Sequence, residues 1–339
     1  MNHIRLISPV DGSLYAERPL IGSHQLEQVL HQAQEAQRAW RQLTLEQRAG
    51  YCLKAVDAML AMKDEIVPEL AWQMGRPVRF GAGELRGFEE RARYMIGIAA
   101  SALADVVPEP KEGFRRFIRR EPLGTVLVVA PWNYPYLTAV NAIIPALMAG
   151  NAVLLKHASQ TLLVGERFAQ AFARAGLPDG LFHNLVLDHG QTGALIASGQ
   201  VQQVNFTGSV EGGRMMESAA AGHFIGVGLE LGGKDPAYVR GDADLAHAVE
   251  NLVDGSFFNS GQSCCGIERI YVDHKLYPAF VEGFVELTRQ YVLGNPLDQA
   301  TTLGPLVRAQ AAEFVRGQIA QATARGARAL IDASSFAAD

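Results

Sequence analysis

The run Gly124-Thr125-Val126-Leu127-Val128-Val129-Ala130 is the clearest indication of the fold, because a continuous apolar stretch is typical of a parallel strand buried on both faces. A helical segment at Leu137–Met148 separates it from a second apolar run, Asn151–Lys156. Further short strands are expected at Leu181–Leu187 and Val201–Phe206. Strands that alternate with helices in this way predict an α/β protein with a parallel sheet covered by helices.

On the N-terminal side, residues 23–105 have the apolar spacing of successive helices. Thr44 and Gln47 form the capping-box pattern that begins one of them. Cys52 lies on a helical apolar stripe, so we expect it to be a small core residue. On the C-terminal side, a new unit is expected beyond Gly232, with helices at 244–257 and 277–291 and a strand between them at 267–272.

Composition limits the classes of protein that the chain can belong to. Its 339 residues suggest two domains, and 48% hydrophobic with 19% charged residues is ordinary for a soluble α/β protein. A net charge of −5 disfavours nucleic acid as a partner. Three cysteines cannot form a disulfide framework, which favours a reducing, cytoplasmic setting. The N-terminus lacks the apolar segment of a signal peptide, and no apolar run predicts a membrane span.

A thiol and a carboxylate are the strongest chemical signals. Cys264 lies on the glycine-rich turn Gly261–Gly266, and Glu230 ends an apolar strand. A thiol attacks only as the thiolate, and a nearby carboxylate can take a proton from the thiol or from water. Cys265 is the alternative nucleophile, or a packing residue, or half of a redox or metal pair. We expect no metal, because no second Cys/His cluster has ligand spacing.

A glycine-rich segment, Phe206–Gly213, lies between a predicted strand and a predicted helix. Backbone amides at Gly208, Ser209 and Gly213 can approach an anion there, because the N-terminus of a helix favours negative charge. The spacing of these glycines differs from the Gly-x-Gly-x-x-Gly fingerprint of dinucleotide-binding proteins. The alternative is a glycine-rich turn with a structural role only.

Three further positions follow predicted strands at the edge where α/β sheets bind ligands. Lys156 ends its strand and Ser159 lies three residues on; a solvated lysine is the alternative. Asn133, in Pro131-Trp132-Asn133, offers an uncharged donor that can stabilise an oxyanion, although an asparagine in a turn is also a common structural feature.

These motifs, and the order in which they follow one another along the chain, resemble those of the aldehyde dehydrogenase superfamily. The resemblance runs from near the N-terminus to the end. The segments that carry the resemblance are Pro131-Trp132-Asn133, Lys156, Gly208-Ser209 with Gly213, Glu230-Leu231-Gly232-Gly233-Lys234, Gly261-Gln262-Ser263-Cys264, Gly294-Asn295-Pro296-Leu297-Asp298 and Leu303-Gly304-Pro305-Leu306-Val307.

The resemblance implies a Rossmann-like NAD(P)-binding domain at 1–231, with N-terminal helices and an oligomerisation-type strand at 113–123, and a partial α/β catalytic domain at 232–339. It also implies oxidation of a small aldehyde to a carboxylic acid. Cys264 would attack the carbonyl carbon, while the Asn133 side chain and the Cys264 backbone amide hold the oxyanion. Hydride transfer would leave a thioester, and Glu230 would activate the water that releases the acid.

The resemblance further assigns cofactor contacts. Gly208, Ser209 and Gly213 match the pyrophosphate loop and Lys156 matches the adenosine-ribose contact, with Pro131, Trp132 and Leu231 in the same site. His157 stands where the family often has proline. Ser159 stands where NAD-preferring members tend to carry a glutamate that repels a 2′-phosphate. We therefore expect NAD⁺ or NADP⁺ as the cofactor, with NADP⁺ tolerated or preferred.

The chain departs from the family at its C-terminal end. Family members usually extend further, into a Glu-x-Phe-Gly-Pro segment at the nicotinamide ribose and a strand used in oligomer formation, and neither occurs here. We therefore expect a fragment or truncated form of an enzyme whose complete form is a homo-oligomer. A non-catalytic nucleotide-binding remnant is the alternative function. The identity of the aldehyde stays open.

Overall fold

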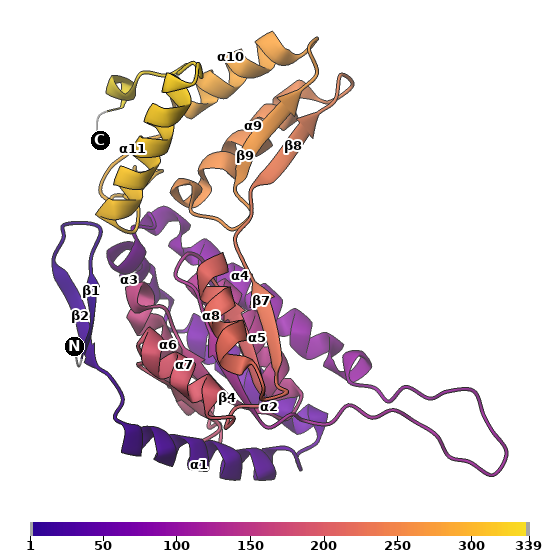
Figure 1. Ribbon diagram of the computed structural model, residues 1–339. Helices are drawn as coiled ribbons and strands as arrows, with labels where there is room; N and C mark the ends of the chain where they lie inside the picture. The colour runs from indigo at the N-terminus through magenta and orange to yellow at the C-terminus, as the bar shows by residue number, and fades with distance from the viewer. Residues whose placement is uncertain (1–2, 337–339) are drawn as a thin grey trace. The chain divides into compact units, whose positions relative to one another are not determined.

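The computed structural model describes residues 3–336, which divide into two compact units (Figure 1). The first, here called the sheet unit, comprises residues 3–5, 16–64 and 83–230. The second, here called the thiol unit, comprises residues 6–15, 65–82 and 231–336. Each unit has its own β-sheet. The functional roles that the sequence assigns to 1–231 and 232–339 stay predictions.

A five-stranded parallel sheet forms the centre of the sheet unit. Every residue of the two central strands β3 and β4 is buried, which confirms the prediction made from their continuous apolar runs. The order across the sheet is β5 (Phe182–Asn184), β4 (Ala152–Lys156), β3 (Thr125–Val129), β6 (Gln203–Thr207) and β7 (Gly226–Glu230). The α/β fold with a parallel sheet is therefore confirmed.

Helices pack on this sheet as the alternating pattern predicts. α5 contacts β3 and β4, α6 contacts β5, and α8 contacts β6 and β7. The capping box at Thr44 begins α2, and Cys52 is fully buried in that helix, so both sequence predictions are confirmed. The helices of this unit are α1 (Ser23–Trp40), α2 (Leu45–Leu60), most of α4 (Val78–Ala102), α5 (Pro135–Met148), α6 (Leu162–Arg174), α7 (His189–Ala197) and α8 (Val210–Ala220).

A buried carboxylate caps the first turn of α5. Glu84, on α4 and 4% exposed, accepts hydrogen bonds through Oε1 from the backbone N–H groups of Tyr136 and Leu137, both at 3.0 Å. These amides lie in the first turn, where the helix itself supplies no acceptor and its dipole favours a negative charge. Glu84 therefore fixes the end of α5 that directly follows the Pro131–Tyr134 loop.

Replacing Glu84 with leucine is expected to lower the free energy of unfolding by about 3 kcal/mol, because two backbone amides, one buried and one partly buried, lose a carboxyl acceptor. Glu84→Gln keeps an oxygen at that position and is expected to cost less than half as much. Urea unfolding of both variants, compared through the transition midpoint at constant m value, measures the difference. A Gln variant as unstable as the Leu variant would show that the charge, rather than the acceptor, holds α5.

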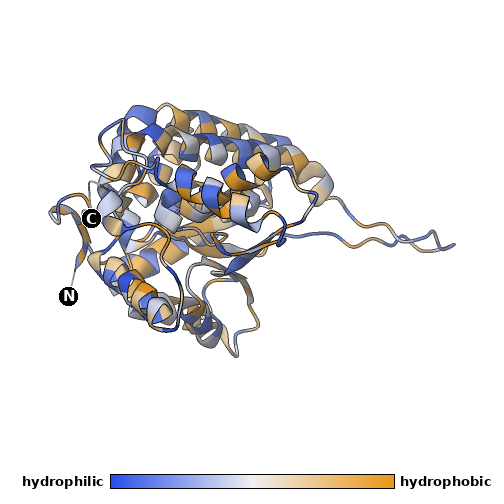
Figure 2. Ribbon diagram, turned by 90° about the horizontal axis from the view of Figure 1, so that it is seen from above, coloured by the Kyte–Doolittle hydropathy of each residue, from blue (hydrophilic) through white to orange (hydrophobic). Residues whose placement is uncertain are grey.

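The strand expected at 113–123 does not form as a regular strand. Residues 104–123 make two isolated antiparallel bridges, Val106 with Ile118 and Lys111 with Phe114. A strand needs a partner along successive residues, and this arm extends away from the helices of its unit (Figure 2). Phe114 and Ile118 are exposed. The Lys111 ammonium lies over the Phe114 ring, and the Arg119 guanidinium lies over the Phe117 ring. The role of the arm in oligomer formation stays a prediction.

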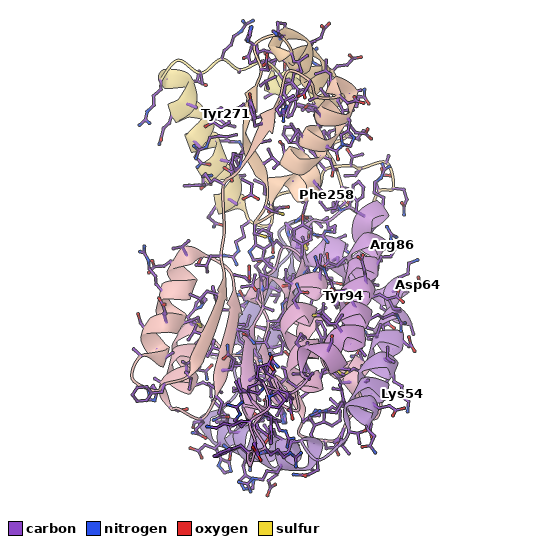
Figure 3. The ribbon with its side chains drawn as sticks, turned by 90° about the vertical axis from the view of Figure 1, so that its right-hand side faces the viewer. Lys54, Asp64, Arg86, Tyr94, Phe258 and Tyr271 are labelled. Carbon is purple, nitrogen blue, oxygen red and sulfur yellow. The ribbon has the colours of Figure 1, made fainter. Side chains whose placement is uncertain are left out.

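The thiol unit contains a smaller parallel sheet, β8 (Asp235–Val239) with β9 (Ile267–Val272). Val239 and the helices α9 (Leu245–Phe257) and α10 (Tyr277–Thr288) form its core, whereas Tyr271 on β9 is exposed (Figure 3). The predicted helix 244–257 and strand 267–272 are confirmed, and the helix predicted at 277–291 ends three residues earlier, at Thr288. Most of α3 (Lys63–Met74) and all of α11 (Ala309–Ala324) also belong to this unit.

The strands β1 (His3–Ile7) and β2 (Leu14–Pro19) pair with each other in a separate two-stranded sheet. Among residues 3–336, none of the helices combines the length and the apolar character that a bilayer crossing needs.

Candidate active site

The carboxyl edge of the large sheet collects most of the site residues that the sequence predicts. Val129, at the end of β3, lies opposite both Lys156 on β4 and Phe206 on β6, and Thr207 lies opposite Glu230 on β7. The four strands are parallel, so the segments that follow them emerge at one edge. The chain continues from β3 to β4 on one side, and β6 then adds on the other side. Ligands bind in α/β sheets at such a reversal of strand order.

The loop after β3 carries Asn133 and is held from two sides. The Asn133 side-chain oxygen accepts a hydrogen bond from the backbone N–H of Tyr134 at 3.0 Å, which orients its amide group. The carbonyl oxygen of Pro135, at the start of α5, lies 3.2 Å from Nε2 of His157. Together with the Glu84 cap, this contact ties the Asn133 loop to the end of β4.

His157 is buried and neutral. A carbonyl oxygen can only accept, so Nε2 carries the proton, and Nδ1 accepts from the backbone N–H of Ala158 and the hydroxyl of Thr161, each at 3.0 Å. Burial lowers the pKa of His157 to about 4, and the positive charge of Lys156 acts in the same direction. The sequence marked His157 as a departure from the family pattern, without indicating that it would link two loops of the site.

Lys156 is 8% exposed, so the alternative of a solvated lysine is wrong. Burial lowers its pKa, while the negative charge of Asp188 opposes that shift. A buried ammonium group with a long stem at a sheet edge is suited to hydrogen-bond donation to a polar ligand.

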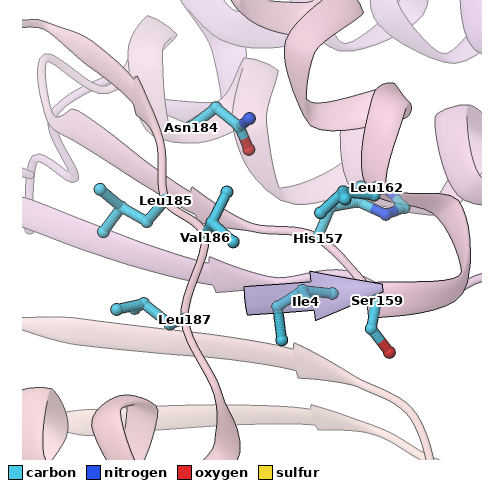
Figure 4. A pocket seen from close by; sticks show the side chains of 8 residues that line it. All are labelled: Ile4, His157, Ser159, Leu162, Asn184, Leu185, Val186 and Leu187. Atoms are coloured by element: carbon cyan, nitrogen blue, oxygen red, sulfur yellow. The ribbon is translucent and has the colours of Figure 1, made fainter. Parts of the chain in front are cut away.

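Ser159 lines a pocket with a mostly apolar wall, beside His157, Leu162 and the segment Asn184–Leu187 (Figure 4). None of the eight residues that line it is acidic. The pocket therefore offers a hydroxyl group and apolar surface, and no carboxylate that would repel a phosphate.

The glycine-rich turn after β6 leads into the N-terminus of α8. Ser209 caps this helix by accepting a hydrogen bond from the N–H of Gly212 at 3.1 Å. A Cβ atom on Gly208 or on Gly212 would lie 2.6 Å from the Phe206 ring, so close packing on this ring already requires glycine at both positions. Gly213 is buried within α8. The structural interpretation of the turn is therefore supported, and its phosphate-binding role stays a prediction.

Glu230 is the last residue of β7 and is exposed. Its carbonyl oxygen accepts a hydrogen bond from the N–H of Gly208 at 3.0 Å, which joins it to the turn after β6. Glu230 thus lies at the same sheet edge as Lys156 and the Asn133 loop. Leu231 is the first residue of the thiol unit.

Cys264 and Cys265 follow a sharply bent turn of the thiol unit, and both are exposed. Exposure alone therefore does not select between the two thiols. Burial raises the pKa of Cys264, and the charge and hydrogen bonding of Cys265 add to this effect. The Cys264 thiol is consequently protonated at neutral pH and needs a base to become nucleophilic. Residues 3–336 contain no group of three or more Cys, His, Asp or Glu side chains suited to a metal ion.

Comparison with known proteins identifies the family. The model of the aldehyde dehydrogenase family matches residues 1–339. The chain is 32% identical over 333 residues to a glutarate-semialdehyde dehydrogenase of Pseudomonas aeruginosa, covering 96% of this chain and 68% of the relative.

Two proteins of Escherichia coli are similar as well. The first is a succinate semialdehyde dehydrogenase named as using NAD(P)⁺, 31% identical over 337 residues, which cover 99% of this chain and 72% of the relative. The second is a solved structure described as an NADP-dependent enzyme, with a TM-score of 0.93 and 30% identity over 97% of this chain and 69% of that one. The chain belongs to the aldehyde dehydrogenase family.

Proposed function

We propose that this protein oxidises an aldehyde to a carboxylic acid with NAD(P)⁺. The observation that carries the proposal is the common sheet edge of the Asn133 loop, Lys156 and Glu230. Family membership supports an oxidoreductase that acts on aldehydes. The overall reaction consumes an aldehyde, NAD(P)⁺ and water, and yields a carboxylic acid, NAD(P)H and a proton.

Cys264 is the proposed nucleophile. Its sulfur loses a proton to a base and adds to the carbonyl carbon, and the resulting thiohemiacetal oxyanion accepts hydrogen bonds from the Asn133 amide and the Cys264 backbone N–H. Bound NAD(P)⁺, held by the residues proposed below, would supply the acceptor for the hydride that leaves this carbon. The substrate then remains on Cys264 as a thioester.

Glu230 is the proposed base for the second half of the reaction. It takes a proton from water, the hydroxide adds to the thioester carbonyl, and the carboxylic acid leaves as the Cys264 thiolate is restored. The exposed position of Glu230 at the end of β7 supports access by water. Asn133 again stabilises the oxyanion that forms during this step.

The cofactor proposal is that NADP⁺ is accepted and is preferred over NAD⁺. Lys156 and Ser159 are proposed to contact the adenosine ribose, and Gly208, Ser209 and Gly213, with Pro131, Trp132 and Leu231, to surround the rest of the cofactor. The pocket beside Ser159 supports this proposal because no acidic residue lines it. The names of the two Escherichia coli proteins are consistent with it.

Ser159→Glu is expected to lower kcat/KM for NADP⁺ by about tenfold or more, because a carboxylate beside the ribose repels the 2′-phosphate. The same variant should change kcat/KM for NAD⁺ much less, and Ser159→Ala controls for loss of the hydroxyl group. Initial rates of reduced nicotinamide formation measure kcat/KM for both cofactors in the parent and in the two variants. A parent protein with a several-fold higher kcat/KM for NAD⁺ would contradict the preference.

The substrate proposal stays at the level of a small aldehyde. The two curated relatives are named for glutarate semialdehyde and succinate semialdehyde, which makes aldehydes with a terminal carboxylate the first compounds to test. The exposed arm at 104–123 supports the further proposal of a homo-oligomer, since it presents Phe114 and Ile118 to solvent.

A further inference from the structure

A buried arginine contacts the turn that precedes the proposed nucleophile. Arg76, between α3 and α4, is 3% exposed, and its Nε donates a hydrogen bond to the side-chain oxygen of Asn259 at 3.3 Å. Asn259 is itself 8% exposed. Burying a guanidinium group is unfavourable unless it makes hydrogen bonds. This contact is therefore a structural interaction of the folded protein rather than an incidental contact at the surface. Both residues lie in the thiol unit.

The turn that Arg76 contacts has an unusual backbone. Asn259, Ser260 and Gly261 have φ angles of 55°, 57° and 72°, so three consecutive residues are left-handed. This conformation is unfavourable for residues other than glycine and persists where surrounding contacts enforce it. Cys264 follows three residues after this segment.

Side-chain hydrogen bonds of the turn enforce that conformation. Nδ2 of Asn259 donates to the carbonyl oxygen of Gln262 at 3.2 Å, and Nε2 of Gln262 donates to the carbonyl oxygen of Asn259 at 3.0 Å. The two residues therefore form a reciprocal pair across the turn. Arg76 binds the other polar atom of the Asn259 amide: it donates to the side-chain oxygen, while the side-chain nitrogen donates to Gln262.

A second segment, 304–307, supports the turn and touches the residue before Arg76. The N–H of Val307 donates to Oε1 of Gln262, and the Ser260 hydroxyl donates to the carbonyl oxygen of Gly304, each at 2.9 Å. A Cβ atom on Gly304 would lie 1.9 Å from the carbonyl oxygen of Gly75. The backbone at 75–76 is therefore packed directly on a segment that holds the turn.

We propose that Arg76 is a positioning residue for the nucleophile: it fixes the Asn259 side chain and, through the Asn259–Gln262 pair, the turn that presents Cys264. The role in catalysis rests on the proposed function, whereas the anchoring of the turn does not. Arg76 acts through Asn259 and touches no reacting atom.

The test compares Arg76→Met, Arg76→Lys and Arg79→Met in the full chain. Methionine fills the buried space without a donor, and lysine restores a donor that can reach Asn259. Arg79 is the matched control, because it is exposed, belongs to the same unit and donates to the carbonyl oxygen of Ala300 at 3.5 Å. Asn259→Gly is a second route, since glycine accepts the left-handed φ but lacks both side-chain hydrogen bonds.

In steady-state assays, Arg76→Met is expected to lower kcat about tenfold with both KM values within about twofold of the parent, since only the geometry of the nucleophile changes. Arg76→Lys should recover most of kcat, and Arg79→Met should match the parent. Independently of turnover, backbone hydrogen exchange of the peptide 258–266 should accelerate about tenfold in Arg76→Met and in Asn259→Gly.

Unchanged exchange in that peptide for both variants would overturn the proposal, and so would an equal loss of kcat in Arg76→Lys and Arg76→Met. Accelerated exchange in a parent protein that oxidises no aldehyde would leave the anchoring intact and overturn the proposed function instead. If Arg76→Met does not fold, Asn259→Gly and Arg76→Lys decide the outcome by the same two readouts.

Discussion

Replacing Cys264 with alanine is expected to abolish aldehyde oxidation, with kcat/KM falling by about 10⁴-fold or more, as losses of a covalent nucleophile do. Without the sulfur, neither the thiohemiacetal nor the thioester can form. Initial rates of NAD(P)H formation with a semialdehyde and saturating cofactor measure the loss. The folded state should be retained, because Cys264 is exposed and makes little contact with a core.

Cys265→Ala is the matched control, because the two thiols are neighbours and both are exposed. It is expected to keep most of the parent activity. Cys52 provides a further comparison: it is fully buried, and burial raises the pKa of its thiol to about 12, which makes it unreactive. If Cys264→Ala were as active as the parent, or if only Cys265→Ala lost activity, the assignment of Cys264 as the nucleophile would be wrong.

Glu230→Gln is expected to lower the steady-state rate by about 10²- to 10⁴-fold, the usual contribution of a general base. The glutamine has nearly the same shape but cannot take a proton from water, so the thioester on Cys264 should accumulate. Rapid mixing with aldehyde and cofactor should therefore give a burst of NAD(P)H close to one equivalent per active site, followed by slow turnover.

Glu268→Gln controls for the loss of one exposed negative charge, since Glu268 pairs with Lys234 on the surface of the thiol unit. It should turn over as the parent does. If Glu230→Gln lost the burst together with turnover, Glu230 would be needed to form the thioester, and its role as the base for hydrolysis alone would be wrong.

Local patterns in the sequence were sufficient for the centre of the sheet. β3 and β4 are buried on both faces, so all their positions except Thr125 and Lys156 are apolar, and the runs are recognisable without a partner. The capping box at Thr44 depends on residues three apart, and it too was predicted. One strand of the thiol unit was not predicted: β8 contains Pro236 and its side chains alternate in exposure, so its sequence pattern is short and weak.

The arm at 113–123 marks the limit of strand prediction. Phe114, Phe117 and Ile118 are residues of high strand propensity, yet a strand forms only where a partner supplies hydrogen bonds along it. Within this chain, residues 104–123 find two isolated bridges. The strand that the family resemblance implies at 113–123 is therefore an element that needs a partner to form.

The chemical residues of the site were accessible from motifs, but the residues that hold them were not. Glu84 caps amides at 136–137, His157 reaches the carbonyl oxygen of Pro135, and Arg76 reaches Asn259, 183 positions along the chain. Such contacts depend on the folded topology and leave no periodic signal in the sequence. A buried arginine or glutamate reads as an ordinary surface charge until its partner is known.

Mass spectrometry of the Glu230→Gln protein detects the covalent bond that we propose between the aldehyde carbon and Cys264. The protein is mixed with a semialdehyde and NADP⁺, quenched in acid within the burst phase, digested and analysed. We predict an added acyl group on the peptide that contains Cys264, present in the Cys265→Ala background and absent without cofactor. An unmodified Cys264 in a sample that has formed an equivalent of NADPH would contradict the account.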